Sequence, residues 1–129
     1  MPELDDCLFC RISRGAGRDR LIYEDDLVFA FDIPEDSPHK RGPVHFMVIP
    51  RRHIPDALHL TADDAELTAR LFTAAADIAR EKGVAESGFR LLTNTGPDGN
   101  QTVSHFHLHC IGGRPLGPEA PWRRVHDRP

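Results

Sequence analysis

The chain has 129 residues and a mass of 14.5 kDa, which is enough for one domain around a single core but too short for two full domains. Its 40% hydrophobic and 28% charged residues are ordinary globular usage and argue against a wholly disordered or fibrous chain. Sixteen basic and twenty acidic side chains leave a formal charge of −4, so we expect no nucleic-acid partner.

The N-terminal segment MPELDDCLFC is acidic and lacks an apolar run of signal-peptide length. No other segment approaches the ~18 consecutive apolar residues that a membrane-spanning helix needs. We therefore expect a cytoplasmic protein that does not bind membranes. Of the three cysteines, Cys7 and Cys10 form a Cys-x-x-Cys pair, which in a reducing compartment indicates metal or redox chemistry rather than a disulfide framework.

The first predicted elements are strands. Residues 21–33 contain two β-rich runs around three acidic residues, Glu24 to Asp26, which predicts a hairpin. Residues 34–43 hold three prolines and a glycine, so we expect a loop there. A further strand is predicted over 44–49, where Pro50 stops it.

The second half of the chain predicts one long helix and two more strands. Thr61 is a candidate N-cap, and apolar residues recur at helical spacing from Leu67 to Ile78 until the sequence Glu-Lys-Gly ends the pattern at Gly83. Strands are predicted over 89–93 and 103–111, joined by a turn-rich loop over 94–100.

The order of these elements predicts the fold class. Strands outnumber helices and have mostly short connections, so we expect an α+β fold with a largely antiparallel sheet and the long helix packed on one face. We expect a single domain over residues 1–118, followed by an irregular C-terminal tail over 119–129.

Three histidines alternate in the last predicted strand. Because successive side chains of a strand point to opposite faces, His105, His107 and His109 should share one face. Such a cluster is either a metal site or an imidazole nucleophile with supporting groups. Amide and hydroxyl donors and two glycines precede it in residues 94–102, and this favours a phosphate site.

The His-x-His-x-His pattern with apolar x resembles the histidine triad (HIT) superfamily. Further segments resemble its nucleotide-binding (Hint) branch in order along residues 7–118, namely Tyr23–Asp26, Asp32–Pro34, His45–Pro50, His53–Ile54, Asn94–Gly96, Gly99–His105 and Gly112–Gly117. The resemblance implies a HIT-like homodimer that hydrolyses the P–N bond of purine nucleoside 5′-phosphoramidates and so binds a purine nucleoside monophosphate.

The resemblance also implies roles for individual residues. His107 matches the nucleophile that forms a nucleotidyl-imidazole intermediate, while His109, His45 and the first triad histidine, His105, match its catalytic surroundings. Asp32 matches the carboxylate that binds both ribose hydroxyls. The remaining substrate-binding positions are apolar residues around the base and polar contacts to the phosphate or leaving group: Phe9, Ile12, Ile33, Asn94, Gln101 and Thr102.

A second set of residues suits a metal. Cys-x-x-Cys followed by two separated histidines suits tetrahedral zinc, and zinc-containing histidine triad proteins use the positions matched by Cys7, Cys10, His53 and His105. The expected cofactor is therefore one structural zinc ion. The alternatives are unliganded thiols or a thioredoxin-like redox pair. A redox pair would need to follow a strand and open a helix, and nothing before Cys7 could be that strand.

Three positions depart from the family pattern. The segment Phe29–Asp32 is one residue shorter than usual before the aspartate, the loop over 34–43 is longer, and Asn100 stands where a glycine usually precedes the glutamine. Two other functions stay open at this point. One is hydrolysis of dinucleoside polyphosphates, as in another branch of the superfamily, and the other is a non-catalytic nucleotide-binding or zinc-stabilised interaction module.

Overall fold

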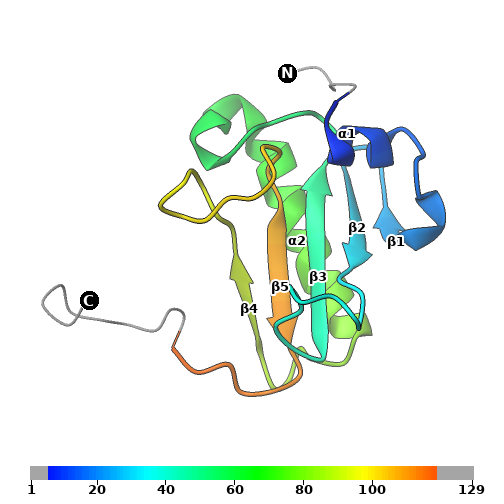
Figure 1. Cartoon of the computed structure of the whole chain (residues 1–129), viewed down its shortest axis with the longest axis vertical. Coiled ribbons are helices and arrows are strands. Elements are labelled where there is room, and N and C mark those ends of the chain that lie inside the picture. Colours follow the sequence, from blue (N-terminus) through cyan, green and yellow to red (C-terminus); the bar gives the residue numbers. More distant parts are fainter. Residues whose placement is uncertain (1–5, 119–129) are drawn as a thin grey trace, which may run out of the picture.

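A computed structural model of the chain describes residues 6–118 and has the expected α+β fold (Figure 1). A five-stranded sheet has the order β1-β2-β3-β5-β4, and every neighbouring pair is antiparallel. The strands are β1 (Leu21–Glu24), β2 (Val28–Asp32), β3 (Val44–Pro50), β4 (Phe89–Leu92) and β5 (Leu108–Gly112). The helices are α1 (Leu8–Ser13) and α2 (Ala65–Glu81), with short 3-10 helices η1 (Arg18–Arg20), η2 (Ala57–His59) and η3 (Ala62–Asp64).

The predicted tail over 119–129 and the first five residues lie outside the described part, so the domain limits stay a prediction. Within residues 6–118, neither helix combines the length and apolar character needed to cross a lipid bilayer.

Helix α2 covers one face of the sheet. Thr61 caps its N-terminal side as predicted, but through one 3-10 turn, η3, in which the Thr61 and Asp64 side chains each bond the other's backbone N–H. The apolar stripe that includes Leu67, Leu71 and Ile78 is buried against Phe46. This packing confirms the predicted long helix and places it behind the sheet in Figure 1.

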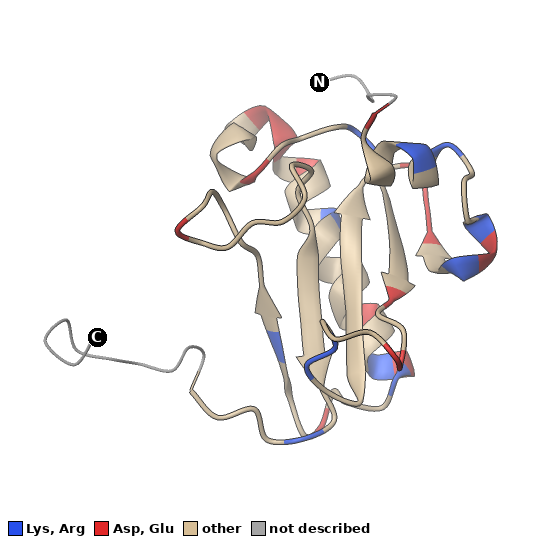
Figure 2. Ribbon diagram, in the orientation of Figure 1, with Lys and Arg blue, Asp and Glu red and all other residues tan. Residues whose placement is uncertain are grey.

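The other face of the sheet carries the histidines. Phe29, Ile33, Met47 and Ile49 form a second buried cluster with Phe9 of α1 on that side. Strands β3 and β5 contain no charged side chain apart from histidine, and Figure 2 shows Lys, Arg, Asp and Glu around the edges of the sheet. The centre of the sheet is therefore buried on both faces, with α1 covering one end of the second face.

Two elements differ from the sequence-based expectation. Helix α1 was not expected, because its six residues are too few for a helical period to emerge; Cys7 is its N-cap and accepts the N–H of Cys10. Strand β5 begins at Leu108 rather than Val103. The backbone N–H of Phe106 instead donates to the carbonyl of Ile54 at 2.6 Å, so the segment before Leu108 leaves the strand ladder.

Asp25 holds the predicted hairpin together. Its Oδ1 accepts the backbone N–H groups of Leu27 and Val28, each at 2.8 Å, and its Oδ2 accepts the hydroxyl of Tyr23 at 2.6 Å. Arg70 of α2 lies 3.0 Å from the same carboxylate, so the turn is tied to the helix as well as to both strands.

We expect Asp25→Ala to lower the free energy of unfolding by about 1–3 kcal/mol, because it leaves two backbone donors of the turn without their partner. The neighbouring Asp26 has an 81% exposed side chain and supplies a matched control, Asp26→Ala, which should cost no more than about 0.5 kcal/mol. Urea unfolding of the two variants measures both values. Equal losses would show that the turn does not depend on the Asp25 bonds.

Candidate active site and metal centre

The three triad histidines lie on the sheet face opposite α2, as the alternation predicted, although only His109 is inside β5. Phe9 of α1 contacts both upstream rings edge-on, with ring centroids 5.7 Å from His105 and 5.4 Å from His107. The rings of His107 and His109 are 5.1 Å apart. The intervening Phe106 and Leu108 belong to the core under α2. Alternation therefore holds through the irregular segment before β5.

His107 is held as a neutral imidazole with one nitrogen free. Its Nδ1–H donates to the carbonyl of His105 at 2.8 Å, which leaves the lone pair on Nε2. Burial lowers the pKa of His107, and the bond to the His105 carbonyl only partly opposes this shift. A neutral imidazole with a free Nε2 is what nucleophilic attack requires.

His45 and His109 form a relay that starts at a backbone amide. The N–H of Arg41 donates to His45 Nδ1 at 3.0 Å, so the proton of neutral His45 lies on Nε2, 2.9 Å from His109 Nδ1. His109 therefore carries its own proton on Nε2. Burial is the main cause that lowers the pKa of His45 to about 4 and that of His109 to about 3, so both rings are neutral near pH 7.

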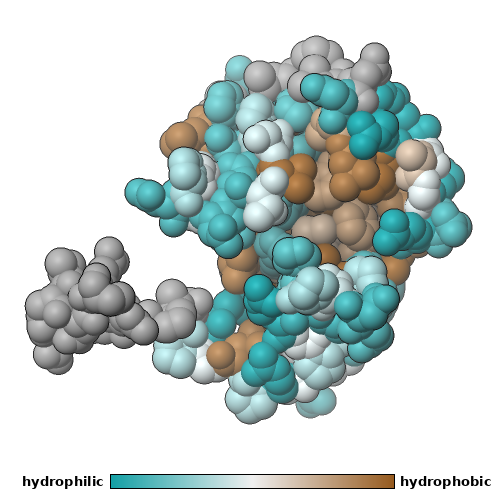
Figure 3. Space-filling model, in the orientation of Figure 1, coloured by the Kyte–Doolittle hydropathy of each residue, from teal (hydrophilic) through white to brown (hydrophobic). Residues whose placement is uncertain are grey.

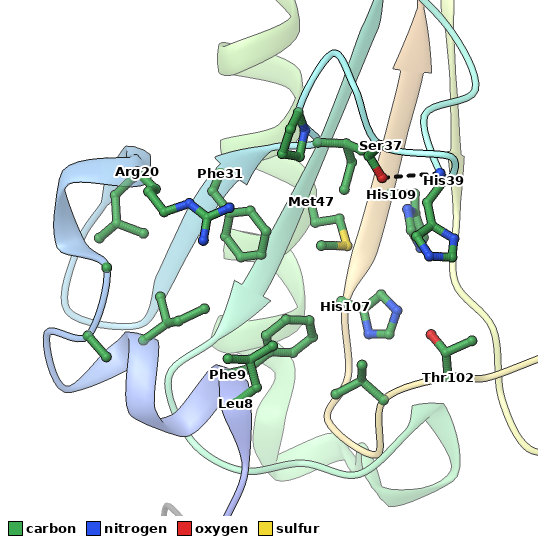
Figure 4. A pocket seen from close by; sticks show the side chains of 17 residues that line it. Leu8, Phe9, Arg20, Phe31, Ser37, His39, Met47, Thr102, His107 and His109 are labelled. Carbon is green, nitrogen blue, oxygen red and sulfur yellow. Dashed lines mark hydrogen bonds between the residues drawn. The ribbon is translucent and has the colours of Figure 1, made fainter.

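A pocket of about 590 Å³ lies between α1, the sheet and the loop over 34–43. Figure 3 shows apolar residues gathered beside α1 and over β2 and β3. Figure 4 shows Phe9 and Phe31 on one side of the pocket and His107, His109 and Thr102 on the other. Six predicted site residues line it: Phe9, Ile12, Ile33, Thr102, His107 and His109. The volume suits a small-molecule ligand with an apolar and a polar end.

Asp32 is not in this pocket. In β2, Phe29 and Phe31 face the pocket side, whereas Ala30 packs under α2, and Asp32 continues the face of Ala30. Its carboxylate lies 2.9 Å from Lys82 Nζ, just after α2. Asp32 therefore lies on the face opposite the pocket, consistent with the missing residue in this segment, because each residue of a strand reverses the side-chain direction; its ribose-binding role stays a prediction.

The side chains of Asn94 and Gln101 also lie outside the pocket. The Asn94 amide donates to the carbonyl of Gly99 at 2.7 Å. The Gln101 Oε1 accepts the N–H of Gly96 at 2.9 Å, and its Nε2 donates to two carbonyls, those of Pro55 and Val103. Neither side chain lines the pocket, and both bond to backbone groups of the 94–101 loop and its neighbours; their contact with the phosphate or leaving group stays a prediction.

The unusual Asn100 has a left-handed backbone with a φ of 61°, which explains why glycine suits this position and why asparagine can replace it. At Gly99, an added Cβ would lie 2.5 Å from the carbonyl oxygen of Thr95. The loop conformation therefore needs a glycine at position 99, whereas asparagine is accommodated at position 100.

The predicted metal ligands converge. The ligand atoms of Cys7, Cys10, His53 and His105 all lie within 4.8 Å of one another. Three sulfur-to-Nδ1 distances are 3.3, 3.3 and 3.5 Å, for Cys7–His105, Cys10–His53 and Cys10–His105. Zn–S and Zn–N bond lengths in a tetrahedral site imply a separation of roughly 3.5 Å. These three separations are close to that value, so the four residues could hold a metal ion of this size.

His105 is also oriented as a ligand. Its Nε2–H donates to the carbonyl of Pro50 at 2.7 Å, which leaves the Nδ1 lone pair directed at the two cysteines. Cys7 opens a helix, as the redox alternative requires, but the sulfurs of Cys7 and Cys10 both lie against imidazole nitrogens.

The pocket has lining residues that the sequence did not indicate. Ser37 and His39 come from the long loop, Arg20 from η1, and Met47 from β3. The proline-rich composition of residues 34–43 predicts a loop, but it carries no signal for the direction of its side chains. Among these four residues, only His39, an isolated histidine in a loop, could have been identified from the sequence as a candidate.

The comparisons with known proteins agree with this geometry. A family model described as scavenger mRNA decapping enzyme C-term binding matches residues 6–117. The chain is 42% identical over 115 residues to the purine nucleoside phosphoramidase of Escherichia coli K12, covering 88% of this chain and 92% of that protein. It is 40% identical over 113 residues to an uncharacterised HIT-like protein of Synechococcus elongatus, covering 87% and 94%.

Solved structures give the same result. A histidine triad protein from Clostridium difficile aligns with a TM-score of 0.81 and 33% identity, covering 92% of this chain and 99% of that one. A HIT family hydrolase from Legionella pneumophila aligns with a TM-score of 0.78 and 35% identity, covering 85% and 95%. The chain belongs to the histidine triad superfamily, and the resemblance seen in its sequence is confirmed.

The buried relay predicts a pH dependence of stability. In the unfolded chain His109 takes up a proton near pH 6.5, whereas in the native state its pKa is about 3. Stability from this residue is therefore complete above pH 6.5 and is lost as the pH falls toward 3, because the unfolded state binds the extra proton.

Between pH 6.5 and 4.5 the free energy of unfolding of wild type should fall as the pH is lowered. In His109→Asn we expect this slope to be smaller by about 1 kcal/mol per pH unit. Urea unfolding at each pH measures the free energy of unfolding of wild type and variant. In the difference between the two values, the contributions of acid-sensitive groups common to both proteins cancel. Parallel curves would contradict the assignment of His109 as a half-buried neutral imidazole.

Proposed function

We propose that this protein is a nucleotide hydrolase that cleaves the P–N bond of purine nucleoside 5′-phosphoramidates through a nucleotidyl intermediate on His107. The observation that carries the proposal is the hydrogen bond from His107 Nδ1 to the His105 carbonyl, because it frees Nε2 as a nucleophile in the wall of the pocket. The name of the 42% identical relative, purine nucleoside phosphoramidase, supports this choice of substrate.

The pocket suits such a substrate at both ends. Apolar side chains, including Phe9, Ile12 and Phe31, can enclose a purine, whereas Thr102 and the Nε2–H of His109 can donate hydrogen bonds to phosphoryl oxygens. No aspartate or glutamate among residues 6–118 lines the pocket, so a phosphate would meet no carboxylate repulsion there.

The reaction balances with one water molecule. His107 Nε2 forms a bond to the α-phosphorus as the P–N bond breaks, and the amine leaves after taking up one proton. Water then attacks phosphorus, the bond to His107 breaks, and a proton is released with the nucleoside monophosphate. Neutral His109 stays within reach of the phosphoryl oxygens in both steps, while the His45 ring and the Arg41 amide hold its orientation.

The second part of the proposal is a structural zinc ion held by Cys7, Cys10, His53 and His105. Four protein ligands close a tetrahedral shell, so a bound zinc ion would contribute folding energy rather than a catalytic water. These ligands join α1 to the segment that carries His105, and Phe9 of α1 packs on His107. The homodimer and the cytoplasmic location stay predictions of the sequence.

The first test removes the nucleophile. His107→Asn should abolish turnover of adenosine 5′-phosphoramidate, to below about 1% of wild type, while AMP binds within about tenfold of wild type, because the substitution deletes the chemical step and keeps most ground-state contacts. His59→Asn makes the same substitution at an exposed imidazole on η2 and should leave kcat unchanged. A His107 variant that keeps more than about a tenth of the wild-type rate would overturn the nucleophile assignment.

The same assay separates the competing functions. Wild-type kcat/KM is compared for adenosine 5′-phosphoramidate and a dinucleoside tetraphosphate. We expect the phosphoramidate to be the better substrate. A preference for the tetraphosphate would assign the protein to the other hydrolase reaction, and AMP binding without turnover of either compound would indicate a non-catalytic module.

The second test removes the metal ligands. Protein purified without chelator should contain about one zinc per chain by elemental analysis, and Cys7→Ser with Cys10→Ser should lose the metal and lower the Tm. Cys110→Ala, which changes the third cysteine, buried outside the cluster, should keep the zinc. A metal-free wild type together with an unchanged Tm in the double variant would leave Cys7 and Cys10 as ordinary thiols.

A further inference from the structure

The loop over residues 34–43 forms a polar wall of the pocket. Ser37 and His39 both line the pocket together with His107 and His109. Figure 4 shows these two loop side chains at the end of the pocket that holds the triad histidines, whereas Arg20 lies at the far end beside Phe31. The wall therefore borders the reacting end of the pocket rather than its apolar end.

Hydrogen bonds within the loop hold this wall in one conformation. The backbone N–H of His39 donates to Ser37 Oγ at 3.1 Å, and the N–H of Ser37 donates to the carbonyl of Pro34 at 3.0 Å. The C-terminal end of the loop is fixed as well. Arg41 donates its N–H to His45, and its carbonyl accepts Arg114 at 2.7 Å. These hydrogen bonds hold the segment that carries Ser37 and His39.

Their chemistry complements that of the rest of the pocket, where Thr102 and His109 can donate hydrogen bonds to phosphoryl oxygens but no carboxylate of residues 6–118 is available to a sugar hydroxyl. Ser37 Oγ accepts the His39 N–H, so its own hydroxyl hydrogen stays available to a sugar hydroxyl. Asp32 has turned to the other face and pairs with Lys82, so no carboxylate among the described residues is available in the pocket. His109 is a neutral imidazole in the wall of the pocket, and His39 is an exposed imidazole of the loop that can donate a ring N–H to a phosphoryl oxygen.

We propose that the loop over 34–43 contributes to sugar and phosphate recognition in this protein, with Ser37 contacting a ribose hydroxyl and His39 contacting the phosphate beside Thr102 and His109. The inference rests on the proposed nucleotide substrate and specifies which residues select it. It adds two substrate-contacting residues to the site and assigns Asp32 to packing between β2 and the end of α2.

The test measures binding of four probes by calorimetry: AMP, adenosine, 2′-deoxy-AMP and 3′-deoxy-AMP. His39→Ala should weaken AMP about tenfold and adenosine less than about twofold, because only AMP carries the phosphate. Ser37→Ala should weaken AMP by about three- to tenfold, and this loss should disappear with one of the two deoxynucleotides, which lacks the hydroxyl that Ser37 contacts.

Asp32→Asn is the matched control, since it changes the carboxylate at the opposite face and should leave all four affinities within about twofold. A His39 variant with unchanged AMP affinity, or with equal losses for AMP and adenosine, would overturn the phosphate contact. The sugar contact would be overturned if Ser37→Ala still bound AMP more tightly than the deoxynucleotides while Asp32→Asn bound them equally well. Wild type that binds neither AMP nor adenosine would instead refute the proposed function.

Thermal unfolding checks that each variant is folded before its affinity is interpreted. Because Ser37 Oγ also accepts a backbone N–H, Ser37→Thr supplies a second variant that keeps the hydroxyl. It should retain AMP affinity to within about threefold if the hydroxyl is the contact. Equal losses in the alanine and threonine variants would mean that the loop conformation, not the hydroxyl, determines binding, and would overturn the Ser37 assignment.

Discussion

The hydrogen bond between His107 Nδ1 and the His105 carbonyl is the constraint on which the site depends, and it is available only because the sheet ends there. Pairing between β3 and β5 runs from Val44 opposite Gly112 to Val48 opposite Leu108. Before Leu108 the chain leaves the ladder, so its carbonyls and those at the end of β3 are free to accept from side chains. The His105 carbonyl accepts His107, and the Pro50 carbonyl accepts His105. Two adjacent imidazoles thereby receive opposite tautomers, one exposing Nε2 to the pocket and the other exposing Nδ1 to the cysteines.

Burial stabilises these neutral tautomers. Imidazoles in contact with Phe9 and with one another lose solvent, so the charged form is disfavoured and a single neutral tautomer is held by whichever backbone group it meets. The tautomers of His45 and His109 are also set by a backbone group. Here the group is a donor, the Arg41 N–H, rather than a carbonyl. The site therefore uses backbone groups, which substitution of side chains does not remove, to set the proton positions of four histidines.

The sequence predicted those parts of the protein that depend on local patterns. The hairpin, the long helix and the alternation of the triad rest on periods of two or 3.6 residues, and each was found. The positions of Asp32, Asn94 and Gln101 depended on more than the identity of a residue. The side chain of Asp32 points to the other face because direction reverses with each residue of a strand; the shortened segment before it was the signal in the sequence, whereas the identity of Asp32 alone carried none. The amides of Asn94 and Gln101 could satisfy either a ligand or the loop backbone, and only the folded loop shows which groups are within reach.

The shortened β2 segment and the lengthened loop after it are two parts of one rearrangement. Removing a residue before Asp32 takes a carboxylate out of the pocket and gives it Lys82 as a partner. The position of His45 is fixed by β3 pairing, and the residues between β2 and β3 form a loop that borders the pocket. That loop supplies the Arg41 amide to the relay on its inner side and presents Ser37 and His39 to the pocket. The segment that we propose to contact the substrate is therefore the same segment that orients His45 and His109, so a substitution that shifts the loop should affect both.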